Sequence, residues 1–437
     1  MIRENALEIF LTGVEVVKPG HFIPGHILIN GNELLAGDQT IHLDKIGKVY
    51  VAAVGKASSA MAEETEKILQ QKISDGLVIT KYGHALPLNS CRTIESGHPI
   101  PDENSLKGGE AMISFFKKTN KGDLIILLVS GGASALMADA PPACTLTDIQ
   151  ITGQLLLDCG ADIEEINTIR KHLSAIKGGQ LMQYTQATVV ALILSDAPGD
   201  DLSVIASGLT APDNTTFEDA WKIIEKYRLQ EELPVEVRTH LLSGRQGSIP
   251  DTPKSGSPIF QNVHNTLVAT NRHALDAAAR KAVELGYRTT ILYPALSGEA
   301  DEKAREFTEV LLRERKQGPV CVLWGGESTV TMKSKGKGGR NQQFALAALN
   351  YLKKEETIKE VSFALLAGGT DGTDGPTDAA GAIITRQSLE KAADLQISPE
   401  AYLGGNDSYH FFEKTGDLIK TGPTQTNVMD LIVGLID

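Results

Sequence analysis

The chain has 437 residues, of which 41% are hydrophobic and 22% charged, a composition typical of globular proteins and not of disordered or fibrous ones. Its 42 Lys and Arg residues against 55 Asp and Glu residues give a formal net charge of −13 at pH 7. This acidic balance argues against general binding of nucleic acid or of an anionic membrane, so a phosphorylated ligand would need a local group of cations and backbone amides.

The sequence indicates a cytoplasmic protein without a membrane-spanning segment. Its apolar runs are short, such as 124–129 and 189–194, whereas a transmembrane helix needs about 20 apolar residues. Arg3, Glu4 and Glu8 interrupt the apolar N-terminus, which argues against a signal peptide. The four cysteines are scattered without a Cys-x-x-Cys pair, so neither a zinc site nor a disulfide framework is indicated. Whether the chain forms a homo-oligomer stays open.

Eight short and nearly continuous apolar runs predict strands that are buried on both faces, as in parallel sheets covered by helices. They are 49–54, 77–80, 124–129, 189–194, 266–269, 290–293, 320–324 and 361–366. Amphipathic helical patterns lie between them, so the fold class is α/β with mainly parallel sheets. The Gly-, Ser- and Pro-rich stretch 243–257 reads as a linker or a long surface loop. We therefore expect two three-layer α/β domains, a Rossmann-like one over residues 1–245 and a second over 246–437.

Ligands of open parallel sheets bind beyond the carboxyl ends of the strands, so the residues after each run are the ones to inspect. The first run ends in Gly55-Lys56-Ala57-Ser58. Glycine permits a tight turn, the following helix offers free amides, and Lys56 adds a cation. The loop is not a Walker A motif, because Tyr50 stands where its first glycine is expected. A solvated lysine beside a packing glycine is the alternative interpretation.

Two further places in the first half favour an anion site. The run 124–129 ends in Ser130, Gly131, Gly132, Ala133 and Ser134, which resembles an anion cradle, although a tight turn without a ligand would look the same. Between the two turns, Pro99 and Pro101 constrain the backbone beside His98. A lone histidine is more often structural than in contact with substrate.

A predicted helix over residues 166–177 carries Arg170 and Lys177, seven residues apart and therefore on one stripe. Gly178-Gly179 would end this helix. A basic stripe is usually a solvated face, but in an acidic protein it can instead point at a phosphate. The run 189–194 then leads to Asp196, Asp200 and Asp201. Carboxylates at a strand end suit Mg²⁺, although they also occur in turns and helix caps.

The second half has three such places. Glu327 follows the run 320–324, and Asp371, Asp374 and Asp378 follow the run 361–366 without the spacing of an EF-hand. Residues 333–340 hold four cations and three glycines just before a helical pattern; they include Lys337, Gly338, Gly339 and Arg340. Such a loop suits several phosphate oxygens, or is a mobile surface hairpin. Together these features predict a cleft between two α/β domains that holds a nucleoside triphosphate, Mg²⁺ and a small polar acceptor.

Ten stretches in chain order resemble the glycerate 2-kinases that carry a C-terminal MOFRL domain, a group once labelled hydroxypyruvate reductase. They are VGKASSAM, SGHPIPDENS, VSGGASALM, INTIRKHLSAIKGGQL, SDAPGDDLSVIASGLT, GGESTV, GKGGRNQQFAL, GGTDGTDGPTDAAGA, NDSYHFF and TGPTQTNVMDL. The resemblance runs from about residue 5 to the end. It implies ATP-dependent phosphorylation of D-glycerate at O2, two α/β domains with the active site in their cleft, and Lys56 and Arg340 as active-site cations.

Chemistry suggests roles for the remaining residues. Arg340, Lys337, Gly338 and Gly339 would cradle the phosphates of ATP, and Lys56 would bridge the transferred phosphoryl group or bind the glycerate carboxylate. Mg²⁺ would be held by Asp196 or Glu327, and Asp374 would accept the hydroxyl proton. Substrate oxygens would meet Ser58, His98, Ser130, Gly131, Gly132, Ser134, Arg170 and Lys177.

Two other functions remain open from the sequence. An NAD(P)-dependent hydroxypyruvate reductase would need a dinucleotide fingerprint, and no Gly-x-Gly-x-x-Gly follows any of the strand runs. A non-catalytic nucleotide- or sugar-acid-binding protein would bind a ligand without releasing ADP.

Overall fold

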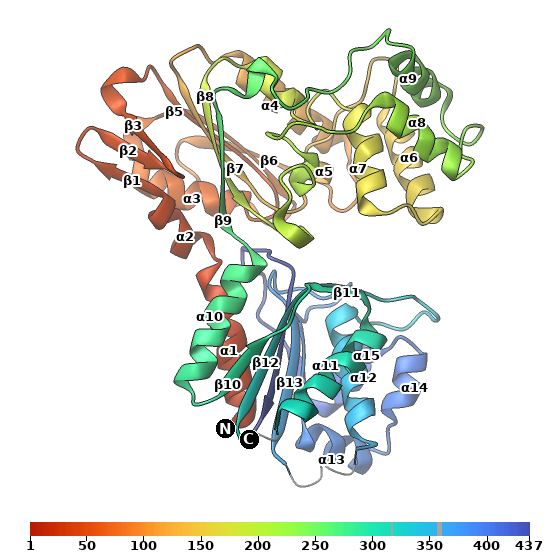
Figure 1. Ribbon diagram of the computed structural model, residues 1–437. Helices are drawn as coiled ribbons and strands as arrows, with labels where there is room; N and C mark the ends of the chain where they lie inside the picture. The colour runs from red at the N-terminus through yellow and green to blue at the C-terminus, as the bar shows by residue number, and fades with distance from the viewer. Residues whose placement is uncertain (316–317, 356–360) are drawn as a thin grey trace. The chain divides into compact units, whose positions relative to one another are not determined.

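The computed structural model describes residues 1–315, 318–355 and 361–437. The chain forms two compact units (Figure 1). We call residues 22–268 the inner unit, and residues 1–21 together with 269–437, which include both chain ends, the terminal unit. This division differs from the expected ranges 1–245 and 246–437, because the N-terminal helix joins the second unit and the residues around β9 stay with the first. No helix among the described residues is long and apolar enough to cross a bilayer.

The inner unit is built on a six-stranded sheet of order β6-β5-β4-β7-β8-β9. The strands are β4 (Val49–Val54), β5 (Ile73–Lys81), β6 (Cys91–Ser96), β7 (Leu124–Val129), β8 (Thr188–Leu194) and β9 (Val263–Ala269). The pairs from β6 to β8 are parallel, as predicted. Val54 lies opposite both Ile79 and Val129, so β4, β5 and β7 end at one edge of the sheet. Both faces of β4 and β7 are buried, which explains their continuous apolar sequences.

The helices of the inner unit form two groups. One group packs on the sheet, and the other builds a separate apolar cluster around Leu156, Ile169 and Trp221. The helices are α2 (Pro19–His26, which starts in the terminal unit), α3 (Ser58–Leu69), α4 (Glu103–Lys117), α5 (Ala133–Leu136), α6 (Leu146–Asp158), α7 (Ile163–His172), α8 (Phe217–Lys226) and α9 (Val235–Arg245). Short 3-10 turns are η1 (Leu43–Lys45), η2 (Gln70–Lys72), η3 (Gln180–Tyr184), η4 (Pro198–Asp200), η5 (Ile205–Ser207) and η6 (Pro258–Phe260). A small antiparallel sheet consists of β1 (Ile27–Asn30), β2 (Glu33–Ala36) and β3 (Gln39–His42).

The sheet of the terminal unit is mixed, so the prediction of a mainly parallel sheet is wrong for this unit. Its order is β10-β12-β16-β13-β14-β15, and β11 also pairs with β12. The strands are β10 (Arg288–Ile291), β11 (Leu296–Glu299), β12 (Val320–Thr329), β13 (Phe363–Gly369), β14 (Gly381–Thr385), β15 (Leu418–Ile419) and β16 (Asp430–Ile436). Among the strand pairs of this sheet that the structure describes, only the pairs of β12 with β10 and with β11 are parallel. The physical reason is that the last strand of the chain, β16, inserts antiparallel between β12 and β13.

Helices cover both faces of this second sheet, which gives the three layers expected (Figure 1). One apolar cluster joins α1 and α10 to the sheet, and another joins α11 and α12 to its opposite face. The helices are α1 (Ile2–Val16), α10 (Asn271–Glu284), α11 (Ala300–Glu314), α12 (Arg340–Leu352), α13 (Arg386–Asp394), α14 (Pro399–Gly404) and α15 (Ser408–Thr415).

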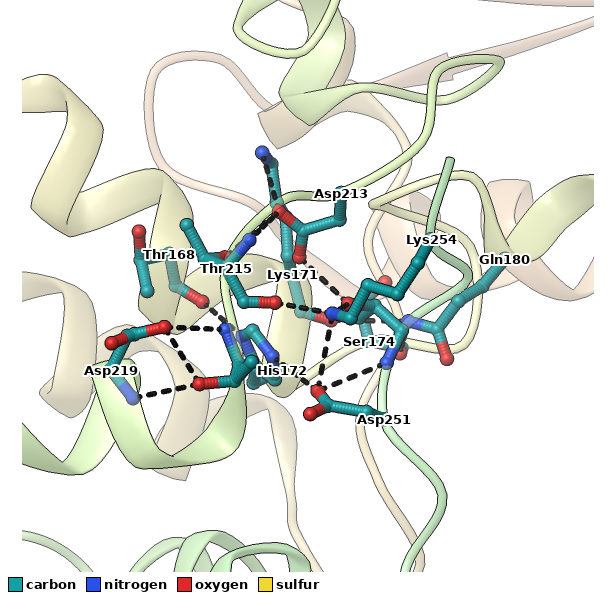
Figure 2. A network of polar contacts seen from close by, with 12 residues as sticks. Thr168, Lys171, His172, Ser174, Gln180, Asp213, Thr215, Asp219, Asp251 and Lys254 are labelled. Atoms are coloured by element: carbon teal, nitrogen blue, oxygen red, sulfur yellow. Dashed lines mark hydrogen bonds and ion pairs between the residues drawn. The ribbon is translucent and has the colours of Figure 1, made fainter. Parts of the chain in front are cut away.

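The stretch 243–257 is not a free linker. Its first residues complete α9, and Thr252 is buried. Figure 2 shows the polar network that holds the rest: His172 Nε2 lies 3.0 Å from Asp251 Oδ1, and Thr252 Oγ1 donates to Asp213 Oδ2 at 2.8 Å. The same Asp213 forms a buried ion pair with Lys171 at 3.2 Å. These contacts attach the Gly- and Pro-rich stretch to α7 of the inner unit.

Candidate active site

The turns after β4 and β7 interlock at the carboxyl edge of the inner sheet. The Lys56 amide donates to the carbonyl of Gly131 at 2.9 Å, and the Ala57 amide donates to Ser130 Oγ at 3.0 Å. Gly55 has φ of +128°, and a Cβ there would lie 2.2 Å from Ser130 Oγ. Only glycine fits this close approach. The structure thus brings together the two turns that the sequence marked.

His98 joins these turns. A Cβ added at Gly132 would lie 2.9 Å from His98 Cδ2 and 3.3 Å from Lys56 Cγ. The Lys56 and His98 side chains therefore both lie against Gly132, although they are 42 residues apart in the sequence. Both side chains are half-buried.

Ser58 and Ser130 have roles different from the predicted one. Both are fully buried. Ser58 Oγ lies 2.7 Å from the carbonyl oxygen of Gly55 and 2.9 Å from that of Ile79, while Ser130 Oγ accepts the Ala57 amide. Because their hydroxyls hold the two turns together, these contacts argue against the prediction that Ser58 and Ser130 bind substrate oxygens.

Ser134 belongs to a short row of polar side chains. Its Oγ lies 2.8 Å from Ser207 Oγ in η5, and the Ser207 hydroxyl donates to Asn167 Oδ1 on α7 at 2.9 Å. Sequence reasoning did not single out Ser207 or Asn167. A signal was available for Ser207, since the Ser207-Gly208 pair marks a turn, and Ser207 adopts a φ of +54° that is uncommon outside glycine.

Arg170 and Lys177 do not share a helical stripe, because α7 ends at His172 and Lys177 lies in the following turn. Gly178-Gly179 does not end the helix either; the two amides donate to the carbonyls of Ser207 and Gly208. Lys177 Nζ donates to the Met137 carbonyl at 3.3 Å and lies 3.6 Å from Asp139 Oδ1.

The two cations are nevertheless neighbours. Burial lowers the pKa of the Lys177 ammonium, Asp139 opposes this shift, and the nearby charge of Arg170 adds to it. Burial also lowers the pKa of the Arg170 guanidinium. Tertiary folding, and not the predicted helical spacing, therefore brings Arg170 close to Lys177.

Arg340 is the centre of the polar cluster in the terminal unit. Its Nε and Nη2 donate to the two oxygens of Asp430 at 2.6 and 3.0 Å, and its Nη1 donates to Glu327. The Arg340 side chain is 33% exposed, whereas Asp430 is fully buried. Burial opposes the charge of Arg340, but the carboxylates of Asp430 and Glu327 outweigh it and raise the Arg340 pKa. Burial is the main cause that raises the pKa of Asp430.

Sheet register explains why Asp430 meets this cluster. Asp430 begins β16 and lies opposite Gly326 in the second half of β12 and Gly369 at the end of β13. Residues after predicted strands were inspected in the sequence, but Asp430 is the first residue of its strand. An antiparallel strand delivers its first residue to the edge where its neighbours end, so this side chain was missed.

Asp374 is 2% exposed and caps α12. Its Oδ1 accepts the Asn341 amide at 3.0 Å, and its Oδ2 accepts the Gln342 amide at 2.8 Å. Burial raises the pKa of Asp374 to about 6, although these two hydrogen bonds act in the opposite direction. With both oxygens engaged in the helix start, Asp374 is better placed to position α12 than to act as the predicted base.

The basic loop before α12 packs closely against the segment 405–408. The Lys337 amide donates to Asp407 Oδ1 at 3.0 Å, and the Lys337 ammonium lies 3.9 Å from the Tyr409 ring centroid. A Cβ at Gly338 would lie 2.2 Å from Ser408 Oγ, and one at Gly339 would lie 2.4 Å from the carbonyl carbon of Asp374. These glycines therefore serve close packing of the loop.

The predicted metal ligands belong to different units. Asp196 is half-buried and follows β8, next to β7 in the inner sheet, whereas Glu327 contacts Arg340 in the terminal unit. In residues 1–315, 318–355 and 361–437 no three His, Cys, Asp or Glu side chains gather as a metal-binding group. The carboxylates of Asp430 and Glu327 both contact the Arg340 guanidinium, while Asp374 accepts backbone amides at the start of the same helix.

Comparison with known proteins shows which family this chain resembles over its length. A family model described as a domain of unknown function (DUF4147) matches residues 5–242, and the MOFRL family model matches residues 320–430. A glycerate 2-kinase from Pyrococcus horikoshii is 38% identical over 441 residues, which cover 100% of this chain and 97% of the relative. A relative from Agrobacterium vitis, 42% identical over 398 residues (89% of this chain, 87% of the relative), carries a provisional hydroxypyruvate reductase name.

A solved structure of a glycerate kinase has a similar fold over the whole length of this chain. The crystal structure of a glycerate kinase from Thermotoga maritima has a TM-score of 0.85 and 37% sequence identity, and the match covers 100% of this chain and 99% of that one. Because the likeness spans both chains from end to end, this protein belongs to the glycerate kinase family in which a DUF4147 domain is joined to a MOFRL domain.

Proposed function

We propose that this protein is an ATP-dependent kinase that phosphorylates D-glycerate at O2 and releases 2-phosphoglycerate and ADP. The observation that carries the proposal is the full-length match to a glycerate 2-kinase, 38% identical over 100% of this chain. The proposed reaction needs cations for the phosphates, a place for an anionic acceptor and a proton acceptor, and side chains of these kinds lie at the sheet edges described above.

In the proposed step, the 2-hydroxyl oxygen attacks the γ-phosphorus of ATP, and the bond from that phosphorus to the β,γ-bridging oxygen breaks as ADP leaves. Arg340, with Lys337, Gly338 and Gly339 before it, binds the phosphates. Asp430 and Glu327 occupy three of the five N–H donors of Arg340, so two remain for phosphate oxygens. Lys56 neutralises the transferred phosphoryl group, and His98, Gly131 and Gly132 line its turn.

The acidic residues take the remaining roles. Asp196, in the turn that follows β8, accepts the hydroxyl proton. Glu327 is the half-exposed carboxylate beside Arg340, so one of its oxygens can face a cation that arrives with the nucleotide. Mg²⁺ bound with ATP would offset phosphate charge, and Glu327 would be its protein ligand. The four free thiols fit the cytoplasmic location that we propose.

Phosphorus NMR of a reaction with D-glycerate, ATP and Mg²⁺ tests the proposal directly. We expect 2-phosphoglycerate and ADP, and much slower turnover of L-glycerate. A 3-phosphoglycerate signal would contradict the regiochemistry. Oxidation of NADH or NADPH by hydroxypyruvate, without ADP formation from glycerate, would favour the reductase instead.

Two variants test the assigned cations. Lys56→Met and Arg340→Lys should each lower kcat by about 100-fold or more, because each removes charge or fork geometry from the transferring phosphate. Lys72→Met and Arg272→Lys are matched controls, since both residues are exposed. Far-UV circular dichroism checks that the variants fold. A folded Lys56→Met or Arg340→Lys enzyme with wild-type kcat would remove that residue from the mechanism.

A further inference from the structure

Arg170 differs from Arg340 in its surroundings. It is half-buried on α7, yet within residues 1–315, 318–355 and 361–437 it has no hydrogen-bond, ion-pair or ring partner. Arg340, by contrast, is held by two carboxylates. Partial burial of an unpaired guanidinium costs free energy, so proteins rarely keep one without a use for it. Its planar donors suit a carboxylate or phosphate from outside the chain.

The charges around Arg170 match a monoanion. Lys177 is its cationic neighbour, and Asp139 is the carboxylate that lies beside Lys177. Asp139 is already engaged, because its Oδ1 accepts the Ser174 hydroxyl at 2.6 Å and its Oδ2 accepts the Ala175 amide. Two cations against one carboxylate leave a net charge of +1. One added carboxylate neutralises this charge, whereas a nucleotide triphosphate would exceed it.

Polar side chains connect Arg170 to the Lys56 turn. Asn167 lies three residues before Arg170 and therefore on the same face of α7. From Asn167 the contacts pass through Ser207 to Ser134, two residues beyond Gly132, against which Lys56 packs. These groups can donate to and accept from alcohol oxygens. A 2-hydroxy acid carries its carboxylate next to its hydroxyl group. Arg170, followed by Asn167, Ser207 and Ser134, offers a cation and then amide and hydroxyl groups in the same order.

Helix α7, which carries Arg170, is held in place by contacts of the next two residues, Lys171 and His172. The network in Figure 2 ties α7 to the loops 213–215 and 251–254 through Lys171 and His172, both buried. Lys171, the residue after Arg170, is neutralised by Asp213 and so adds no free charge. A rigid support of this kind holds a binding residue in place before its ligand arrives.

We infer that Arg170 recognises the carboxylate of the hydroxy-acid acceptor, with Ser134, Ser207 and Asn167 beside the alcohol oxygens and Lys177 reinforcing the positive charge. The inference rests on the proposed kinase function and assigns the site's preference for acidic acceptors to one residue. Arg170 is then a specificity-determining residue, and the nucleotide does not touch it.

The test compares the wild type with Arg170→Gln and Arg170→Lys. Acceptors are D-glycerate and its neutral amide, glyceramide. In Arg170→Gln we expect the KM for D-glycerate to rise about 10- to 100-fold, as loss of a charge-assisted pair implies, with the KM for ATP unchanged within about twofold. The preference for D-glycerate over glyceramide should fall by a similar factor. Arg170→Lys should retain part of the preference, because it keeps the charge and loses the fork.

Stability provides a second readout. Arg170→Gln should melt at or above the wild-type temperature, since it removes an unpaired charge and no described hydrogen bond. A structural role would lower Tm instead. Arg92→Gln, on the exposed side of edge strand β6, is the matched control and should keep wild-type kinetics.

The outcomes separate the two proposals. A wild-type enzyme that makes no phosphoglycerate overturns the kinase function itself. An active wild type, together with folded Arg170 variants that keep the KM for D-glycerate and the preference over glyceramide, overturns only the Arg170 assignment. A rise in the KM for ATP alone also overturns it, because Arg170 would then bind nucleotide phosphate. If Arg170→Gln does not fold, the same kinetics on Arg170→Lys decide.

Discussion

Single side chains of the site are held in two contrasting ways. Arg340 is paired with a fully buried carboxylate, Asp430, which fixes the direction of its fork. Asp374 is also buried, but it faces backbone amides rather than the guanidinium. The amides at the start of the helix favour its charged form, but burial outweighs them. A carboxylate in this position is costly to ionise, and its effect on folding should depend on pH.

We predict that Asp374 destabilises the folded protein at neutral pH relative to mildly acidic pH. Burial raises the pKa of Asp374 to about 6 from 3.8, so the folded state holds its proton over a range where the unfolded chain has lost it. The free energy of unfolding, taken as wild type minus Asp374→Asn, should fall by about 2 kcal/mol between about pH 4 and about pH 7. Urea unfolding across this range measures the difference.

The exposed Asp394→Asn serves as the control for this experiment. A difference between wild type and Asp374→Asn that stays constant with pH would mean that Asp374 titrates alike in the folded and unfolded states.

At the level of elements, the basic loop and α12 form one packed unit with the segment 405–408. The amides of Lys333 and Lys337 donate to the side chains of Asn406 and Asp407. Gly339 lies where the loop passes against the backbone of Asp374, just before the helix begins. A loop anchored in this way presents its cations at a defined place, which a freely moving hairpin could not do.

Gly339→Ala should therefore lower stability as well as activity. Its Cβ would lie 2.4 Å from the carbonyl carbon of Asp374, so backbone must shift, at a cost of about 1–3 kcal/mol. Gly404→Ala is the matched control, because it ends α14 with nothing within 4 Å of the new Cβ and should be neutral or slightly stabilising. Thermal unfolding and kcat are measured for both. Lost activity at unchanged stability would contradict this packing role.

For the whole molecule, the path of the chain matters most. The chain starts in the terminal unit with α1, builds the inner unit, and then returns. Helix α1 packs on α10 and on the sheet strands β13 and β16 (Figure 1). Phe10 is buried at this contact, where a Cβ on Gly368 would lie 2.9 Å from its ring. The first residues of the sequence thus complete the core of the last part.

Phe10→Ala should destabilise the terminal unit although the mutation lies at the N-terminus. Loss of a buried Phe costs about 3–5 kcal/mol through lost burial and the cavity left behind. Hydrogen exchange followed by mass spectrometry should show faster exchange in peptides from 363–369 and 430–436, and little change in 124–129. Leu11→Ala is the control, since Leu11 is 41% exposed. Faster exchange confined to the inner unit would contradict this assignment of α1.

Much of the α/β organisation was readable from local patterns. Each of the eight predicted apolar runs overlaps an observed strand, and the runs 49–54 and 124–129 match β4 and β7 residue for residue. Parallel strands buried on both faces leave continuous apolar sequences, and the turns that follow them are rich in glycine. The nearness of Lys56 to Gly131 follows from this pattern once β4 and β7 pair.

Other parts could not be read in this way. The C-terminal run that became β16 was overlooked, and with it the antiparallel pairing that brings Asp430 to Arg340. The end of α7 at His172 was also missed, because a helical stripe continues in the sequence where the backbone turns away. A sequence does not show whether a serine hydroxyl is buried, so Ser58 and Ser130 were predicted to bind substrate oxygens.

Neighbouring residues in the sequence determine which runs become strands and where turns occur. They also determine which cations and carboxylates lie near strand ends. Pairing between distant segments decided the rest, namely that Asp430 holds Arg340, that Asp374 caps α12, and that Arg170 has no partner of its own within the described chain. The reason is physical. Secondary structure responds to periodicity over a few residues, whereas the ionic and hydrogen-bond state of a side chain depends on groups that only folding brings within reach.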